Sequence, residues 1–432
     1  MNNVRLGDVA RIAISGVDKK TKDGEHPVRL CNYVDVYHNW SIHSDTANAF
    51  MEASVTDKEL AGFSLRRGQV AITKDSETRD DIGHSTYIAD DLDGVVLGYH
   101  CALITPDKTM LDGSFLNALL HTGYARKCFE NNASGSGQRY TLTIDALKKL
   151  ELQLPALEVQ RPIGDLLDSI DKKIAVNRKI MDELERTLKL IFDYWFVQYD
   201  FPMSDGRPYK TCGSEMIWNE DLHCEIPAQW SIAKLDTLIT LVRGVSYTSA
   251  NLGDSGSPMI NLASFSPDCS YNVEGIKYFN GQFQQEKTLH PYDLVICNTQ
   301  QTALNPSIDI IGKPLLVPDI FDRPVMSSHH VTTVKAINEP IKYYLYSFFK
   351  TPWFATYIAG YATGTSILGL DNTGLLNLAL PIPPDYLLDQ FASLVLSAER
   401  EKSRIILENQ SLLRLRDWLL PMLISGQAII GE

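Results

Sequence analysis

The chain carries a weak internal duplication, and this constrains its fold because each half must form the same elements in the same order. The first half opens with residues 4–10 (VRLGDVA) and the second with residues 230–238 (WSIAKLDTL). Each half then has a strand-like apolar run, at 68–74 (GQVAITK) and at 291–299 (PYDLVICNT). A repeat of this length predicts two domains of one architecture.

The two halves also end alike. Each has a glycine-rich turn, at 135–142 (GSGQRYTL) and 362–370 (ATGTSILGL). The next segments, 150–155 (LELQLP) and 376–381 (LNLALP), alternate apolar and polar residues and stop at proline, which predicts short strands. After each proline a glutamine, Gln160 or Gln390, opens a long helical pattern.

We therefore predict an α+β fold. Two mixed α/β domains lie in a pseudo-twofold arrangement, separated by a long antiparallel two-helix coiled coil. The expected parts are a first domain, a central spacer helix, a linker rich in Pro, Gly, Ser and Asp, a second domain and a C-terminal spacer helix, at residues 1–155, 156–199, 200–229, 230–385 and 386–432.

The helical predictions rest on apolar residues at steps of three or four. The first series is Val159, Ile163, Leu166, Ile170, Ile174, Met181, Leu184, Leu188, Ile191 and Trp195. The second is Phe391, Leu394, Ala398, Ile405, Leu412, Leu419 and Leu423. Two such seams can bury each other as an antiparallel pair, although each could also be an ordinary core helix of its own domain.

Polar residues interrupt these seams. Asn177 falls in the gap of the first, and Asn409 falls in the second. A buried asparagine can determine helix register at some cost in stability, whereas the alternative places both side chains in solvent. The first helix would extend about 55 Å at 1.5 Å per residue, longer than one turn of DNA at about 34 Å.

Composition and missing motifs exclude several classes of site. No stretch reaches the length of about 18 apolar residues that a membrane span needs, and residues 1–16 lack the apolar core of a signal peptide. The seven cysteines form no CxxC pair, which argues against a zinc site or a disulfide framework. No phosphate-binding P-loop or methyltransferase catalytic turn is present, so we predict neither a catalytic nor a metal site.

These residues together resemble the specificity subunit of a type I restriction-modification system. The resemblance covers nearly the whole chain. It rests on the glycine turns, the Leu-x-Leu-Pro strands, Gln160 and Gln390, residues 226–230 (IPAQW) and residues 419–427 (LLPMLISGQ). It implies two target-recognition domains that each read one half of a split DNA site, and helices that set the spacing and dock partner subunits.

The resemblance also implies the partners. These are double-stranded DNA, two modification (methyltransferase) subunits and restriction/translocase subunits. The expected location is the cytoplasm, and no membrane partner is expected. S-adenosylmethionine would belong to the methyltransferase subunits, and ATP and Mg to the restriction subunits, with no cofactor in this chain. Because that partner methylates adenine, an adenine is expected in each half-site.

Base edges are read by Arg, Lys, Asn, Gln, Ser and Thr side chains on loops. In the first half the candidates are Thr73, Lys74, Ser76, Arg79, Gln138, Arg139 and Tyr140. In the second half they are Asn298, Thr299, Gln300, Gln301, Ser327, His329, His330, Thr365 and Ser366. The alternative is that the glycine turns merely shape loops, with glycine supplying a positive φ.

The net charge of −13 is unusual for a DNA-binding chain, which normally carries a basic footprint. Either the DNA-facing surface is locally basic, or partner subunits supply most phosphate contacts. Two other functions stay open on the sequence alone: an enzyme with an unrecognised site, and an adaptor whose helices scaffold proteins without touching DNA.

Overall fold

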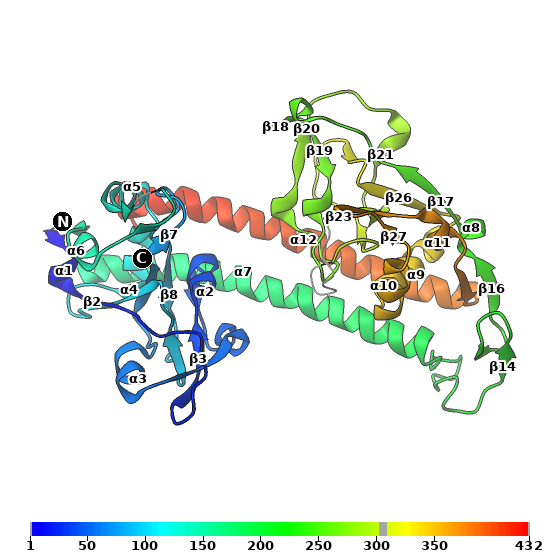
Figure 1. Cartoon of the computed structure of the whole chain (residues 1–432), viewed down its shortest axis with the longest axis horizontal. Coiled ribbons are helices and arrows are strands. Elements are labelled where there is room, and N and C mark those ends of the chain that lie inside the picture. The colour runs from blue at the N-terminus through cyan, green and yellow to red at the C-terminus, as the bar shows by residue number, and fades with distance from the viewer. Residues whose placement is uncertain (1, 136, 302–308, 431–432) are drawn as a thin grey trace. The chain divides into compact units, whose positions relative to one another are not determined.

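The computed structural model describes residues 2–135, 137–301 and 309–430, and the chain divides into two units (Figure 1). Unit 1 comprises residues 1–176 and 409–432, and unit 2 comprises residues 177–408. Both boundaries fall inside the long helices α7 (Leu157–Phe192) and α12 (Asp385–Ile424), so each helix contributes a segment to each unit. Among the described residues, no helix is long and apolar enough to cross a membrane.

Unit 1 is a mixed α/β domain followed by the first segment of α7. Its strands are β1 (Asn2–Arg5), β2 (Ala10–Ile14), β3 (His26–Cys31), β4 (Ser41–Ile42), β5 (Met51–Val55), β6 (Val70–Thr73), β7 (Asp75–Ser76), β8 (Ser85–Ile88), β9 (Val95–Leu97), β10 (Cys101–Pro106), β11 (Ser134–Gly135), β12 (Tyr140–Thr141) and β13 (Glu151–Leu154). Its short helices are α1 (Leu6–Val9), α2 (Tyr33–His38), α3 (Asp57–Phe63), α4 (Gly113–Leu120), α5 (Gly123–Asn132) and α6 (Ile144–Lys148).

Unit 2 repeats this plan. Its strands are β14 (Met216–Asn219), β15 (Cys224–Pro227), β16 (Ser231–Lys234), β17 (Ile239–Arg243), β18 (Leu252–Gly253), β19 (Ser257–Ile260), β20 (Lys277–Phe279), β21 (Thr288–Leu289), β22 (Leu294–Cys297), β23 (Thr299–Gln301), β24 (Pro314–Leu316), β25 (Val325–Ser327), β26 (Val331–Ala336), β27 (Ala362–Thr363), β28 (Ile367–Leu370) and β29 (Ala379–Ile382). Its short helices are α8 (Leu235–Leu238), α9 (Glu339–Phe349), α10 (Pro352–Ala359) and α11 (Asn372–Leu376).

The sheets confirm the duplication. The order β2-β10-β6-β8-β4 in unit 1 corresponds to β17-β26-β22-β24 in unit 2, and β11-β12-β7 corresponds to β27-β28-β23. In each unit a strand near the start of the repeat pairs with the last strand before the long helix: β1 pairs with β13, and β16, which follows the β14–β15 hairpin, pairs with β29. The predicted fold class of two mixed α/β domains and two long helices is therefore confirmed.

Both predicted terminal strands exist, with one shift. β13 stops before Pro155 as expected, whereas β29 begins at Ala379 and continues through Pro381 to Ile382. Residues 372–376 form α11 instead of the start of that strand. Proline is tolerated because, among the strands that the structure describes, β29 pairs with β16 alone, so its other edge makes no ladder bonds with them.

The two helix-opening glutamines are not equivalent. The Gln160 side chain is fully buried; it accepts a hydrogen bond from Asp112 N at 2.9 Å and donates to the carbonyls of Met110 (2.9 Å) and Pro155 (2.8 Å). Gln390 is exposed. Counted from the preceding strand, the position of Gln160 is taken in unit 2 by buried Leu388, so the sequence match at Gln390 was wrong.

Replacing Gln160 with alanine should therefore destabilise unit 1. The change leaves a buried N–H and two carbonyls without partners, which costs about 1–3 kcal/mol. Urea unfolding followed by fluorescence measures this cost. Gln390→Ala is the matched control and should change stability by less than about 0.5 kcal/mol. Equal effects of the two variants would contradict the assignment.

Of the seventeen residues in the two predicted apolar seams, eight are buried, seven are half-buried and two are exposed. Ile163, Ile170, Ile174 and Leu188 of α7 are buried. Val159 and Leu394, however, are 45% and 40% exposed. Near its start each helix packs against its own domain, so the buried face there includes Leu167 of α7 and Val395 of α12. Asn177 is buried, and its amide donates to Glu408 at 2.9 Å, so the solvent-facing alternative is wrong for Asn177.

A half-buried charge cluster joins the two helices within unit 2. Glu185 of α7 forms ion pairs with Lys402 of α12 and with Lys350 at the end of α9, and Lys402 also pairs with Glu399 at 2.5 Å. Burial raises the pKa of Glu185, but the two lysines outweigh that effect and lower it to about 2. Since residues 177 and 185 face residues 408 and 402 respectively, the two segments run antiparallel.

The Glu185 cluster predicts a pH-dependent stability of unit 2. The carboxylate's pKa is depressed from 4.5 to about 2, so its contribution is full above pH 4.5 and is lost as the pH falls toward 2. Glu185→Gln should lower the free energy of unfolding at pH 7 by on the order of 3 kcal/mol and flatten the acid limb. Thermal unfolding from pH 2 to pH 7 measures both effects.

Glu183→Gln provides the control for this prediction, because Glu183 is an exposed residue of the same helix paired with Arg186. It should leave the acid limb unchanged. If stability falls equally steeply at acidic pH with and without the Glu185 carboxylate, the cluster is not the cause of that pH dependence.

The predicted linker, residues 200–229, is folded. Phe201, Tyr209 and Ile226 are buried in the main core of unit 2, and β14 pairs with β15 as a hairpin. The Pro, Gly, Ser and Asp residues of this segment shape its turns, while its aromatic residues pack.

Candidate nucleic-acid interface

A polar cleft of about 550 Å³ opens in unit 1 beside β7. Aromatic side chains, an arginine, an amide and carboxylates line it together, which is a mixed set of stacking, donor and acceptor groups. The lining residues are Tyr33, Val34, Tyr37, His38, Asp75, Ser76, Glu77, Thr78, Asp81, His100, Gln138 and Arg139.

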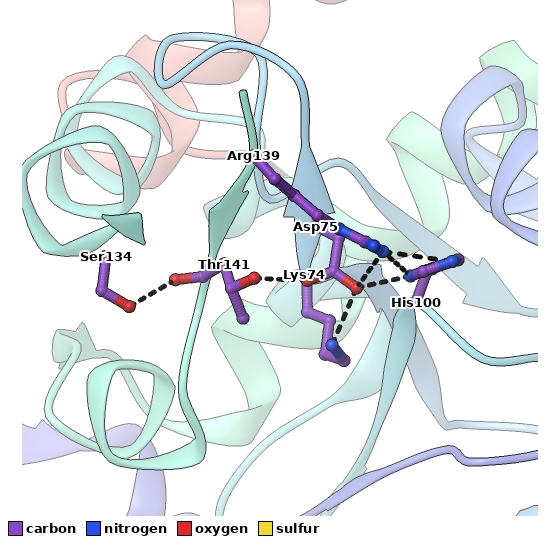
Figure 2. A network of polar contacts seen from close by, with 6 residues as sticks. All are labelled: Lys74, Asp75, His100, Ser134, Arg139 and Thr141. Atoms are coloured by element: carbon purple, nitrogen blue, oxygen red, sulfur yellow. Dashed lines mark hydrogen bonds and ion pairs between the residues drawn. The ribbon is translucent and has the colours of Figure 1, made fainter. Parts of the chain in front are cut away.

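Asp75 is the centre of the polar contacts in this cleft (Figure 2). Its carboxylate accepts hydrogen bonds from Lys74 Nζ at 2.8 Å and Thr141 Oγ1 at 2.6 Å. His100 Nδ1 lies 2.5 Å away, and Arg139 Nη2 lies 3.3 Å away. Only 8% of the Asp75 side chain is exposed, against 57% for Arg139, so a buried acid holds an exposed base.

Asp75 is negatively charged at neutral pH. Burial raises the pKa of this carboxyl, but hydrogen bonds from Lys74, Thr141 and His100 outweigh burial and lower the pKa to about 2. A permanent negative charge on a largely buried group orients the surrounding cations and keeps them in place.

A second cluster supports the wall of the cleft formed by α2. The Tyr37 hydroxyl donates to Asp81 at 2.9 Å, His84 Nε2 lies 2.7 Å from the same carboxylate, and Arg126 lies 3.1 Å from His84 Nδ1. Burial and the nearby Arg126 charge lower the pKa of His84, which favours the neutral form of its ring. These contacts hold Tyr37 in position.

Unit 2 has the same local backbone geometry. In unit 1, Lys74 N donates to the His100 carbonyl at 2.8 Å, and Leu142 N donates to the Lys74 carbonyl at 2.7 Å. In unit 2, Asn298 N donates to the His330 carbonyl at 3.0 Å, and Leu370 N donates to the Asn298 carbonyl at 2.9 Å. Lys74 and Asn298 are therefore equivalent, as are His100 and His330.

The side chains at these positions repeat as well. His330 Nδ1 lies 2.8 Å from Thr299 Oγ1, just as His100 contacts Asp75. Each histidine ring also contacts the aromatic ring of the preceding residue. The ring centroids of Tyr99 and His100, and those of His329 and His330, are both 3.9 Å apart. The two sites differ in charge, since Thr299 replaces Asp75.

The glycine turns have a structural role in both units. Gly135 and Gly364 have φ values of 152° and 136°, and a Cβ on either would lie 2.1 Å from the carbonyl oxygen of Arg139 or Ile367. Glycine is thus required for the close approach of the two strands. The same turns expose Gln138, Arg139, Thr365 and Ser366 at their tips.

The predicted site residues divide by exposure. Exposed are Arg79, Gln138, Arg139, Thr365 and Ser366; half-buried are Lys74, Tyr140, Asn298, Thr299, His329 and His330. The side chain of Gln301 lies outside the described residues. Ser76 is largely buried but lines the cleft.

Three predicted residues are buried and do not face solvent. Thr73 is fully buried and accepts a hydrogen bond from His84 N, while Ser327 is buried inside β25. Gln300 is 5% exposed; it accepts from Ile310 N (2.7 Å) and Ile311 N (2.8 Å) and donates to Asp309. Their polarity beside an apolar strand led to their selection. The hydrogen-bonding groups of Thr73 and Gln300, however, are occupied within the fold.

Asp75, Tyr37 and the pair Tyr99–His100 are not among the residues predicted from the sequence. The duplication contains a signal for the last pair, because the predicted residues His329 and His330 occupy the equivalent position. No group of three or more His, Cys, Asp or Glu side chains placed to hold a metal ion occurs in the described part of the chain.

Gln300→Ala should lower the stability of unit 2 by about 1–3 kcal/mol, because it leaves two backbone N–H groups without an acceptor. Thermal unfolding measures the loss. Gln284→Ala, at an exposed position without a side-chain capping bond, is the control and should be neutral. A neutral Gln300→Ala variant would contradict the structural role.

Comparisons with known proteins agree with this geometry. The family described as the type I restriction modification DNA specificity domain matches residues 1–186. The Type I restriction enzyme HindI specificity subunit of Haemophilus influenzae is 22% identical over 98% of each chain. The MjaIX specificity subunit of Methanocaldococcus jannaschii is 24% identical over 99% of this chain and 93% of its own.

The fold is also similar to a solved structure. The type I restriction-modification S subunit from M. genitalium superposes with a TM-score of 0.58 and 15% identity, covering 100% of this chain and 96% of the other. At that identity the match concerns the fold alone.

Proposed function

We propose that this chain, which is a specificity subunit of the type I restriction-modification family, reads a bipartite DNA site with one half-site per recognition domain. The chain is a non-catalytic subunit that supplies DNA sequence specificity to a complex. The observation that carries the bipartite reading is the repeated site: the same strand, glycine turn and histidine occur in both units.

The chemistry of the clefts suits DNA. Arg139, Gln138 and Arg79 present donors at the exposed edge of unit 1, and Thr365 and Ser366 present hydroxyls in unit 2. These groups, together with Lys74, Ser76, Tyr140, Asn298, Thr299, His329 and His330, make up the proposed interface. With a net charge of −13, the chain needs partner subunits to supply much of the phosphate contact.

The chain acts with DNA and with the other subunits of the system. We assign docking of two methyltransferase subunits to the long helices, which expose apolar side chains at Val176, Ile180, Leu190, Leu407, Leu415 and Trp418. Restriction/translocase subunits would join this core in the cytoplasm. S-adenosylmethionine would be bound by the methyltransferase subunits, and ATP and Mg by the restriction subunits. An adenine in each half-site follows from this assignment.

We assign the functional parts at the boundaries that the sequence predicts, with recognition domains at residues 1–155 and 230–385, spacer helices at 156–199 and 386–432, and a connecting segment at 200–229. The spacer role is supported by the unit boundaries, which fall at residues 176/177 of α7 and 408/409 of α12.

Lengthening both helices at these boundaries tests the proposal. Seven helical residues inserted after Val176 and seven after Glu408 keep the Asn177–Glu408 hydrogen bond within unit 2. They add about 10 Å to each segment and rotate it by only about 20°. We expect the recognised site to gain about three base pairs of spacer, since base pairs rise by about 3.4 Å each. Mapping the methylated bases in DNA modified by the assembled complex measures the spacing.

The outcome of this mapping separates the alternatives. An unchanged spacer in an active complex would refute the ruler role. Methyl transfer or cleavage by the purified chain alone would favour an enzyme, and sequence-independent binding by the complex would favour an adaptor. Insertion of seven residues in each of two exposed loops is the control for loss of folding.

A further inference from the structure

One position differs sharply between the two equivalent sites. The carbonyl of Arg139 meets Gly135 as the carbonyl of Ile367 meets Gly364, both at 2.1 Å from the glycine's Cβ position. Both residues therefore occupy the same place at the start of equivalent strands, next to Tyr140 of β12 and Leu368 of β28. One is a cation, and the other is an aliphatic side chain that is 60% exposed.

Arg139 is held in one orientation from below. Its Nη2 contacts both Asp75, at 3.3 Å, and His100 (Figure 2). A guanidinium carries five N–H donors, two of them on Nη2. Because Asp75 and His100 Nδ1 lie 2.5 Å apart, one Nη2–H points to both, and the other Nη2–H forms a two-donor edge with the neighbouring nitrogen for an external acceptor. The anionic Asp75 is in turn held by Lys74 and Thr141. A base-reading side chain needs such a locked rotamer and a supporting set of hydrogen bonds.

We infer that Arg139, oriented by Asp75 and His100, reads a guanine in the half-site of unit 1, and that Ile367 reads a thymine methyl group at the equivalent place in unit 2. This inference rests on the proposed function. A bidentate arginine matches the O6 and N7 acceptors of guanine, and an exposed aliphatic side chain matches the C5-methyl of thymine.

The site in unit 2 could not support an arginine in the same way. Thr299 stands where Asp75 stands, so the carboxylate that would orient a guanidinium is missing. Arg243, which lines the small neighbouring cleft of unit 2, donates instead to the His329 carbonyl at 3.2 Å. The unit 2 position is thus suited to an apolar contact, and Asp75 is a positioning residue present in unit 1 alone.

Arg139→Lys tests the guanine contact against a phosphate contact. Lysine keeps the charge but loses the bidentate fork. We expect discrimination at one guanine of one half-site to fall about 5- to 150-fold, with the other half-site unchanged. Asp75→Asn, which preserves shape, should relax the same guanine position. The measurement is methylation of a library of randomised sites by the assembled complex.

Arg66→Lys is the matched control, since Arg66 is an exposed arginine of the same unit paired with Asp93 outside the cleft. It should leave the recognised sequence unchanged. For unit 2, uracil in place of the contacted thymine should weaken binding by the wild-type complex and not by the Ile367→Ala complex.

The inference is overturned if the wild-type site has no guanine in the half-site affected, or if Arg139→Lys leaves the sequence preference intact and alters affinity alone. Those results would leave bipartite reading standing. A wild-type complex without any sequence preference would instead overturn the proposed function itself. Because Arg139 is exposed, unchanged thermal unfolding of its variants is expected and confirms that folding is preserved.

Discussion

The pairing of a strand near the start of each repeat with the last strand before its helix is the constraint on which the rest depends. β1 pairs with β13 and β16 with β29, so the start and the end of each domain meet. A long helix then leaves from that junction within two or three residues. A domain of this kind can be duplicated as a unit, because its last strand both completes the domain and leads directly into the long helix.

The same backbone arrangement positions the proposed recognition residues in both units. In both units a histidine carbonyl and the amide of the residue after a core strand align the same three strands, and the glycine turn projects residues past the edge. The side chain at the end of the glycine turn can therefore differ between the units, as Arg139 in unit 1 and Ile367 in unit 2 do. In the proposed account an acidic protein can bind DNA, because a few oriented side chains would read bases while the partners would provide most of the phosphate attraction.

The sequence predicted the elements better than the side-chain roles. The spacing of apolar residues and the positions of prolines predicted the terminal strands and the long helices. The internal duplication predicted two domains with the same order of elements. Gln160 and Gln390 looked alike in sequence, yet only Gln160 is buried against its domain. Gln300 looked like a base reader because it is polar after an apolar strand, but it binds the backbone of a neighbouring turn. Its contacts lie ten residues away, and no local pattern encodes them.

His100 and Asp75 show what a comparison of the halves can add. Neither residue stands out alone, because a single histidine or aspartate is common. Aligned by backbone hydrogen bonds, His100 falls on His330 and Asp75 on Thr299, which reveals both the shared frame and the difference in charge.

The most direct test of the central claim is a base-resolution map of methylation in DNA modified by the complex assembled on this chain. Two domains that each read a half-site predict two short specific sequences separated by a spacer of constant length and free sequence. A single continuous recognition sequence, or modification without sequence preference, would contradict that claim.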